Sequence, residues 1–386
     1  MLAHSAALVV FVACGPARAP APAPGNWEAV THLLDSVTAA GAAPGAVLGV
    51  SLNGRHYFYG AGRLGTDDPA RPDSSTIYDL ASVSKVVALT TLAMQAVESG
   101  LLDLDAPVSH YLPEFVGWDS AGTVQPVTIR HLLTHSSGLP AWRPLYQETA
   151  TRREALALAD TTRLLTPPGA AFVYSDLGAI VLTQVIERLL GARIDTLFAR
   201  RVAEPLGLTD TRYLPPPAWL ARIPPTENDP WRGRTLRGEV HDENAARLDG
   251  VSGHAGLFGS ARDLVKFADW LIAEVNADGP PSPFAIHLRE ARAFTTVQDL
   301  PPGSSRALGW DTPSGESSGG RYLRPGSFGH TGFTGTSIWI DPSRRLAIVL
   351  LSNRVNPTRQ NSRWGPVRAL VANRVVEALA PESLTR

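Results

Sequence analysis

Apolar side chains recur along this chain at helical spacing in some segments and in strand-like runs in others. The first helical pattern covers 27–41, where apolar side chains fall on one face. Two apolar runs then flank Asn53-Gly54, which predicts a β-hairpin because both turn positions tolerate a positive φ. The two expected strands cover 46–52 and 55–62.

Helical patterns dominate the middle of the chain. Residues 82–99 predict a buried helix that ends at Gly100, a residue suited to a C-cap. Three further helices are expected at 127–135, 152–159 and 176–190. The proline-rich stretches between the helices predict irregular loops.

Strand patterns return near the C-terminus. Ser260, followed three residues later by Asp263, predicts the start of a helix. Apolar runs at 334–341 and 345–353 predict two antiparallel strands, and an amphipathic helix follows at 364–379. Strands at both chain ends with helices between them predict an α/β fold. It would have one antiparallel sheet flanked by helices plus an all-helical domain. The expected α/β domain covers 27–81 and 245–386, and the helical domain 82–244.

Composition narrows the classes of function. The 386 residues are 44% hydrophobic and 18% charged, an ordinary globular composition that supports a core without disulfides or metals. The 35 Lys+Arg and 36 Asp+Glu residues give a net charge of -1, so there is no electrostatic case for a nucleic-acid partner. With one cysteine, no zinc-type cluster forms. We therefore expect neither a metal nor a cofactor.

Residues 1–26 predict export. An apolar run at 5–13 has signal-peptide length, is too short to span a membrane, and leads to Cys14. This arrangement resembles a bacterial lipobox, in which the cysteine becomes lipidated, and the Pro/Ala stretch after it would form an extended tether. The alternative is a plain cleavable signal peptide. Either interpretation predicts a periplasmic or membrane-anchored protein that contacts the membrane only through a lipid.

Ser82 and Lys85 stand at the head of the predicted helix 82–99. Residues three apart share a helix face, so Lys85 can lie under the Ser82 hydroxyl. A serine becomes nucleophilic when a neighbouring base takes its proton, and a lysine can serve if burial lowers its pKa. Alone, this pattern is a weak signal that occurs by chance in many chains, and the alternative is an N-capping serine beside a lysine that reaches solvent.

Two further motifs follow Ser82 and Lys85 in order. The first, Tyr174-Ser175-Asp176, opens a predicted helix, and the second, HTG at 330–332, opens a predicted strand. Together they resemble the S-x-x-K, Y-x-N and K/H-T-G motifs of serine β-lactamases and penicillin-binding proteins. From residue 27 the chain is similar to the branch that holds class C β-lactamases, D-alanyl-D-alanine carboxypeptidases and family VIII carboxylesterases.

The resemblance implies a site between an α/β domain and an all-helical domain. Ser82 would form an acyl-enzyme that water hydrolyses, and Lys85 and Tyr174 would share the proton transfers. The backbone N–H groups of Ser82 and Phe333 would form an oxyanion hole. His330 and Thr331 would face a substrate carboxylate. The implied substrate-binding residues are Asp176, His330, Thr331, Gly332 and Phe333.

Two positions depart from the usual motifs. Asp176 stands where asparagine is commoner, and an ionised carboxylate can accept a hydrogen bond from a substrate amide but cannot donate one. His330 stands where lysine is commoner. With a pKa near the reference value of about 6.5, its charge would depend on pH.

Other candidate motifs favour structural roles. Residues 315–319 match G-x-S-x-G, but no predicted strand precedes them and no helix follows, so we expect a surface loop. His131 and His135 lack the acidic partner of a metal motif, which favours packing or capping. Residues 241–243 with His254 are expected to brace a loop that borders the cleft.

Three functions remain open. The favoured one is hydrolysis of amide bonds in a small molecule or peptide, such as a peptidoglycan stem peptide or a β-lactam. The second is a carboxylesterase on small acyl esters, and the third is a penicillin-binding sensor without turnover. The presence of Ser82, Lys85 and Tyr174 argues against the sensor, and the HTG motif favours a carboxylate-bearing substrate.

Overall fold

The protein's computed structural model describes residues 26–278 and 288–381. The predicted signal peptide, Cys14 and nearly all of the Pro/Ala tether lie outside these residues. Within the two described ranges, no helix has both the length and the apolar character that a membrane span needs.

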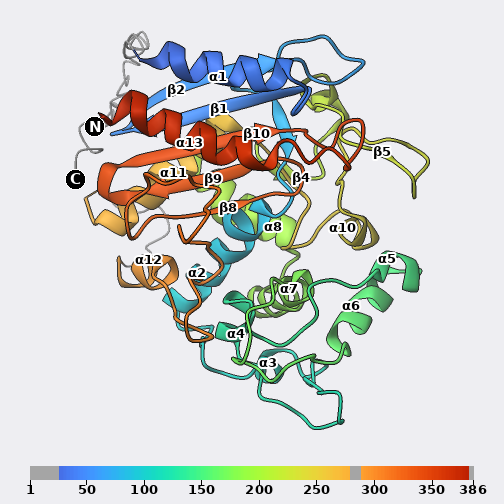
Figure 1. Ribbon diagram of the computed structural model, residues 1–386. Coiled ribbons are helices and arrows are strands. Elements are labelled where there is room, and N and C mark those ends of the chain that lie inside the picture. The colour runs from blue at the N-terminus through green and yellow to red at the C-terminus, as the bar shows by residue number, and fades with distance from the viewer. Residues whose placement is uncertain (1–25, 279–287, 382–386) are drawn as a thin grey trace, which may run out of the picture.

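A five-stranded antiparallel sheet joins the two ends of the chain (Figure 1). Its order is β2-β1-β10-β9-β8, so the N-terminal hairpin lies beside the C-terminal strands and the prediction of a shared sheet is confirmed. In this register Val47 of β1 pairs with Leu351 of β10. The strands are β1 Gly45–Leu52, β2 Arg55–Gly62, β8 Phe328–Thr331, β9 Ser337–Asp341 and β10 Leu346–Ser352.

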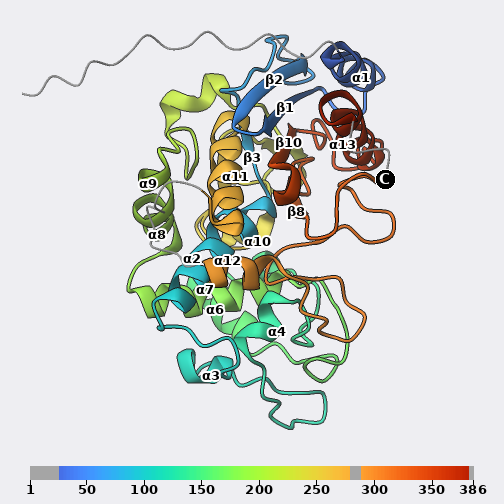
Figure 2. The same ribbon diagram turned by 90° about the vertical axis from the view of Figure 1, so that its left-hand side faces the viewer.

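Helices cover both faces of this sheet (Figure 2). Helices α1 (Trp27–Ala39) and α13 (Gly365–Leu379) pack on one face, against side chains such as Leu48 and Ile348. Helix α11 (Ala261–Asn276) packs on the other, where Val47 and Val349 point. Successive side chains of a strand point to opposite faces, which explains why these continuous apolar runs supply two cores.

The helical part of the molecule lies beyond one edge of the α/β part (Figure 1). Its buried centre is formed by α2 and α7. One apolar cluster includes both of these helices and sheet residues such as Val47 and Leu351, so the two parts share a core. The helices outside the sheet layers are α2 Thr91–Glu98, α3 Val108–Tyr111, α4 Ile129–Leu133, α5 Leu145–Glu148, α6 Arg152–Asp160, α7 Asp176–Leu190, α8 Ile194–Phe198, α9 Glu204–Leu206, α10 Glu243–Arg247 and α12 Leu288–Thr295.

Two small sheets complete the fold. Strand β7 (Leu257–Ser260) pairs with β3 (Ile77–Asp79) and with β4 (Arg212–Tyr213). A ribbon of two short strands, β5 and β6, lies apart from them. The three-stranded sheet positions chemistry, because β3 leads directly to Ser82. The ribbon consists of β5 Asn228–Asp229 and β6 Arg234–Thr235.

Local sequence signals account for several element boundaries. Asn53 and Gly54 adopt φ values of 52° and 73°, as the predicted hairpin turn requires. The Ser260 hydroxyl accepts a hydrogen bond from the Asp263 N–H and caps α11, as predicted. One expectation is wrong: the HTG motif ends a strand rather than opening one, because β8 stops at Thr331.

Candidate active site

Ser82 follows a tight turn at the end of β3. Ala81 adopts a φ of +46°, a region that costs a non-glycine residue energy and is favoured at functional turns. Two hydrogen bonds hold this backbone: Leu80 N–H donates to Leu257 O, and Ala81 N–H donates to Asp79 Oδ1, each at 2.9 Å. Ser82 is thereby presented just ahead of a π-helical segment, Lys85–Thr90, that continues into α2.

The Lys85 ammonium lies among three oxygen atoms. Its Nζ donates to Ser82 Oγ and to the His254 carbonyl, each at 2.9 Å, and forms an ion pair with Asp176 Oδ1 at 2.7 Å. An ammonium has three protons to donate. Because the residue is only 3% exposed, these oxygens replace water as its partners.

This arrangement corrects the expectation that burial makes Lys85 a neutral base. Burial does act to lower the pKa of Lys85, but the negative charge of Asp176 and the neighbouring Tyr174 outweigh it and raise that pKa. Lys85 therefore rests as a cation paired with Asp176. Asp176, which stands where asparagine is commoner, therefore causes the raised pKa of Lys85.

Tyr174 stands directly before α7, which Ser175 caps by accepting a hydrogen bond from the Gly178 N–H. Its ring lies 4.5 Å from the His135 ring and 5.8 Å from the His330 ring, measured between centroids. Burial raises the pKa of Tyr174, and the positive charge of Lys85 only partly opposes that effect. The hydroxyl therefore rests protonated.

The turn after β8 approaches Ser82 from the opposite side. A Cβ on Gly332 would lie 2.5 Å from the Leu80 carbonyl oxygen and 2.1 Å from Thr336 Oγ1, so only glycine allows this approach. Among the described residues, the N–H groups of Ser82 and Phe333 donate no hydrogen bond. Both donors are therefore available to a ligand.

His330 is buried beside this turn, at 3% exposure. Its Nδ1 lies 2.8 Å from the Thr331 carbonyl, and its Nε2 is buried without a partner among the described residues. Burial, with help from the charges of Arg306 and Lys85, holds the pKa of His330 well below its usual value. The expectation of a charge that changes near neutral pH is therefore wrong, and His330 is neutral there.

A cleft of about 700 Å³ brings these groups together. It is lined by Ser82, Tyr174, Asp176 and the segment 330–333, whereas Lys85 lies beneath the floor. That volume suits a small molecule or a short peptide. Several lining side chains were not indicated by the sequence motifs, among them Arg306, Arg354, Arg368 and Trp142.

Arg306 lines the cleft and has little internal pairing. It is 14% exposed, its Nε lies 3.6 Å from Asp311 Oδ1, and its buried Nη1 has no hydrogen-bond partner among the described residues. Its guanidinium carbon lies 5.6 Å from the Tyr174 ring centroid and 5.1 Å from that of Phe172. No motif marks this arginine in the sequence, because it lies in an irregular segment far from the others.

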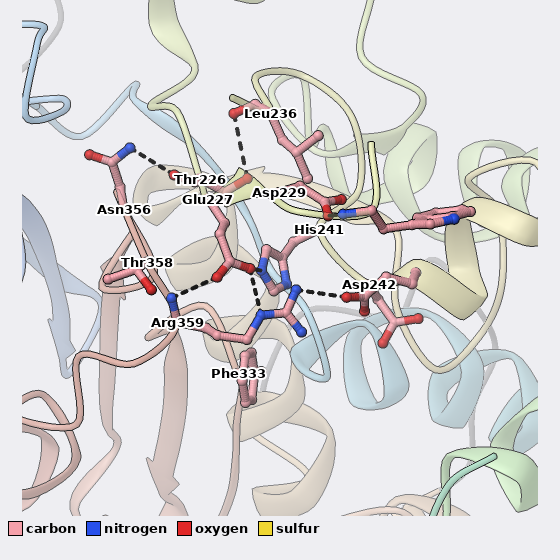
Figure 3. Close-up of polar contacts among 12 residues, drawn as sticks. Thr226, Glu227, Asp229, Leu236, His241, Asp242, Phe333, Asn356, Thr358 and Arg359 are labelled. Carbon is pink, nitrogen blue, oxygen red and sulfur yellow. Dashed lines mark hydrogen bonds and ion pairs between the residues drawn. The ribbon is translucent and has the colours of Figure 1, made fainter. Parts of the chain in front are cut away.

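A buried polar cluster supports the Phe333 side of the cleft (Figure 3). The Glu227 carboxylate lies 2.8 Å from His241 Nε2 and accepts a 2.6 Å hydrogen bond from Arg359. Burial acts to raise the pKa of Glu227, but these two partners outweigh it and bring it to about 2. The Phe333 ring stacks on His241, and Arg354 donates to the Phe333 carbonyl at 2.8 Å. Asp242 Oδ1 lies 2.9 Å from His254 Nε2, and Arg359 donates to Glu243 at 2.7 Å, so the prediction that residues 241–243 with His254 brace a loop at the cleft is confirmed.

The remaining candidate motifs have structural roles. His131 Nδ1 accepts from the Thr128 N–H and completes a capping box, while His135 packs on Tyr174. No metal-binding group of His, Cys, Asp or Glu occurs in residues 26–278 and 288–381. Ser317 lies in a loop that is flanked by neither strand nor helix, as expected.

Two curated bacterial proteins are similar over most of the chain. An N-acetylmuramyl-L-alanine amidase of Bacillus subtilis (strain 168) is 33% identical over 361 residues, which covers 84% of this chain and 80% of the relative. A putative D-alanyl-D-alanine carboxypeptidase of Escherichia coli (strain K12) is 30% identical over 315 residues, which covers 75% of this chain and 71% of the relative.

Solved structures share the fold. EstCE1, a hydrolase with promiscuous acyltransferase activity, superposes with a TM-score of 0.72 at 23% identity, covering 91% of this chain and 98% of EstCE1. A class C β-lactamase gives a TM-score of 0.71 at 20% identity, and the superposition covers 92% of this chain and 96% of the β-lactamase. The sequence model of the Beta-lactamase family matches residues 30–373. The chain therefore belongs to the β-lactamase family and is a serine hydrolase.

Proposed function

We propose that this enzyme hydrolyses amide bonds through an acyl-enzyme on Ser82, as a D-alanyl-D-alanine carboxypeptidase or a β-lactamase of this family does. The observation that carries the proposal is the contact between Lys85 Nζ and Ser82 Oγ, in a cleft where two backbone N–H groups have no partner among the described residues. The N–H groups of Ser82 and Phe333 would bind the oxygen of the attacked carbonyl. Preorganised donors of this kind lower the barrier to acyl transfer.

The proton path follows from the protonation states at rest. Ser82 Oγ attacks the carbonyl carbon while its proton passes to Lys85, which hands one of its own protons to Asp176. Tyr174 protonates the departing amine nitrogen as the C–N bond breaks, leaving an ester on Ser82. The proton on Asp176 then returns through Lys85 to Tyr174, and water hydrolyses the ester. Lys85 remains cationic at the start and end of each transfer.

The charge of the cleft supports an anionic substrate. Arg306 offers an Nη1 that has no hydrogen-bond partner among the described residues, and Thr331, at the end of β8, lines the same cleft. A guanidinium and a hydroxyl are suitable partners for a carboxylate such as the C-terminus of a peptide. Two curated relatives carry names that refer to peptidoglycan peptides, which agrees with this choice.

A carboxylesterase acting on small acyl esters is the second candidate. The neutral state of His330 favours it, because one of the charges that would select an anionic substrate is missing. The catalytic steps would be the same, with an alcohol as the leaving group.

One panel separates these functions. A single preparation is assayed with a D-Ala-D-Ala peptide, nitrocefin and p-nitrophenyl butyrate. We expect the peptide or nitrocefin to give the higher kcat/KM. A strong preference for the butyrate ester would select the esterase, and binding without turnover of any of the three would contradict the enzymatic proposal.

We further propose export with a lipid on Cys14, which would hold the enzyme at the membrane surface near peptidoglycan. The support is the sequence of residues 1–26 alone. Intact mass of the membrane fraction should show a diacylglyceryl-sized increment on Cys14. Recovery only as an unlipidated chain cleaved at another position would contradict this part of the proposal.

A further inference from the structure

Three aromatic side chains form a continuous surface beside the cleft, here called the aromatic shelf: Trp142, Tyr146 and Trp231. The ring centroids lie 6.3 Å apart between Trp142 and Tyr146, and 4.7 Å apart between Tyr146 and Trp231. Trp142 lines the cleft. The two tryptophans are 46% and 41% exposed, which is high for such large apolar side chains.

The Tyr146 part of the shelf is held in place by α10. The Tyr146 N–H donates to Asn244 Oδ1 at 3.1 Å, and Arg247 donates to the Tyr146 carbonyl at 2.9 Å. The same Asn244 side chain donates to the Arg143 carbonyl at 2.9 Å. The backbone that carries the shelf is therefore held within α5 and just before it.

The Trp231 part is fixed in a similar way. Its N–H donates to Asp229 Oδ1 at 2.8 Å. The guanidinium carbons of Arg232 and Arg247 lie 5.0 Å and 5.9 Å from its ring centroid. A surface that is both exposed and rigid has little ordering cost when it binds a ligand.

The shelf continues directly from the catalytic groups. The Asp176 N–H donates to the Ala141 carbonyl at 2.9 Å, and Ser175 Oγ donates to the Pro140 carbonyl at 2.7 Å. Trp142 thus follows a segment that is bonded to the start of α7. A substrate that occupies the cleft would reach the shelf within a few residues, since an extended peptide spans about 3.5 Å per residue.

The chemistry of the shelf points to an amphipathic ring as its ligand. Exposed apolar patches next to a cleft mark ligand-binding grooves. The guanidiniums of Arg232 and Arg247 lie over the Trp231 ring, and the Tyr146 hydroxyl accepts a hydrogen bond from Gln147, so polar groups lie beside the aromatic side chains. A pyranose matches such a surface, because its C–H face packs on an aromatic ring while its hydroxyl and acetamido groups meet polar partners.

We propose that the aromatic shelf binds the amino-sugar portion of a peptidoglycan fragment whose peptide portion lies in the cleft. This inference rests on the proposed function, because it assigns the substrate of the same site. The preferred substrate is then a sugar-bearing peptide rather than a free peptide.

Binding to the inactive Ser82→Ala enzyme tests the proposal without any turnover. Calorimetry compares a disaccharide-linked stem peptide with the same peptide lacking the sugars. We expect the sugar-bearing ligand to bind about tenfold more tightly. Trp142→Ala and Trp231→Ala should each remove most of this advantage, and Trp231→Ala, at a residue outside the cleft lining, should leave the Kd of the bare peptide unchanged. Trp118→Ala is the matched control, because Trp118 is 39% exposed on the loop between α3 and α4.

Equal Kd values for the two ligands, no binding of the sugar-bearing ligand, or an unchanged advantage in both shelf variants would overturn the proposal. Failure of the proposed function is distinguishable, since it would appear as absent turnover by the wild-type enzyme of peptide and β-lactam substrates. The binding measurement does not depend on that result.

Discussion

The pairing of Asp176 with Lys85 decides the resting charge of the site. A buried lysine without a carboxylate would lose its proton more easily, whereas here the aspartate at 2.7 Å keeps it charged. The sequence showed that Asp176 departs from the usual motif. It did not show the consequence for Lys85, because a side-chain ion pair across two elements is a property of tertiary structure.

The charge of Lys85 is directly measurable, because the chain contains only two lysines, Lys85 and Lys266. In protein labelled with ¹³C-lysine, we expect Lys85 to stay protonated beyond the ordinary lysine pKa of about 10.4. In Asp176→Asn, burial should dominate and its pKa should fall below that value. Lys266, whose side chain is 40% exposed, supplies the second lysine signal and serves as the internal reference for assignment. A neutral Lys85 at pH 7 in the wild type would contradict the proposed proton path.

Arg306 should determine the preference for an anionic substrate. Arg306→Gln removes a charged donor, so the KM for a carboxylate-bearing substrate should rise about tenfold or more. The KM for a neutral ester should stay near the wild-type value, and Arg306→Lys should restore part of the preference.

The pH dependence of KM for the anionic substrate tests whether Arg306 or His330 supplies the attracting charge. A guanidinium does not titrate near neutrality and His330 is already neutral, so the wild-type KM for the anionic substrate should be flat from about pH 6 to 8. A KM that climbs with pH in this range would show that His330 supplies the attracting charge instead.

At the scale of elements, strong local signals in the sequence predict a hairpin and a helix start, whereas very short strands leave no recognisable pattern. Asn53-Gly54 and the Ser260 cap specify a hairpin and a helix start through their own side chains and φ values. Strands β3, β4 and β7 have only two to four residues, too few to show an alternating pattern. The HTG motif was assigned to the wrong end of a strand because the pairing of β8 with β9 depends on contacts that the local pattern does not contain.

The close approach of the β8–β9 turn to Ser82 makes Gly332 sensitive to substitution. In Gly332→Ala the new methyl would meet the Leu80 carbonyl and Thr336, so the turn must shift and carry the Phe333 N–H with it. We expect kcat to fall about 100-fold, as when an oxyanion-hole donor is lost. Gly178→Ala in α7 is the control, because its methyl would meet only ordinary contacts at 3.6 Å or more. Equal kcat in Gly332→Ala and the wild type would contradict this account of the turn.

Over the whole molecule, the cleft depends on segments that are far apart in sequence. Three ordered motifs were enough to predict which residues around Ser82 meet, and the structure brings all of them together. Arg306 and Trp142 were missed because each lies in a loop and gains its role only from its neighbours in the fold. The domain boundary at residue 245 stays a prediction, since one apolar core runs through both parts.

The central claim is that Ser82 carries the acyl group. The most direct measurement is the intact mass of the enzyme after reaction with benzylpenicillin or a fluorophosphonate, followed by mapping of the modified peptide. We predict one adduct on Ser82, its loss in Ser82→Ala, and normal labelling of Ser317→Ala. An adduct that persists in Ser82→Ala, or that disappears only in Ser317→Ala, would contradict the account.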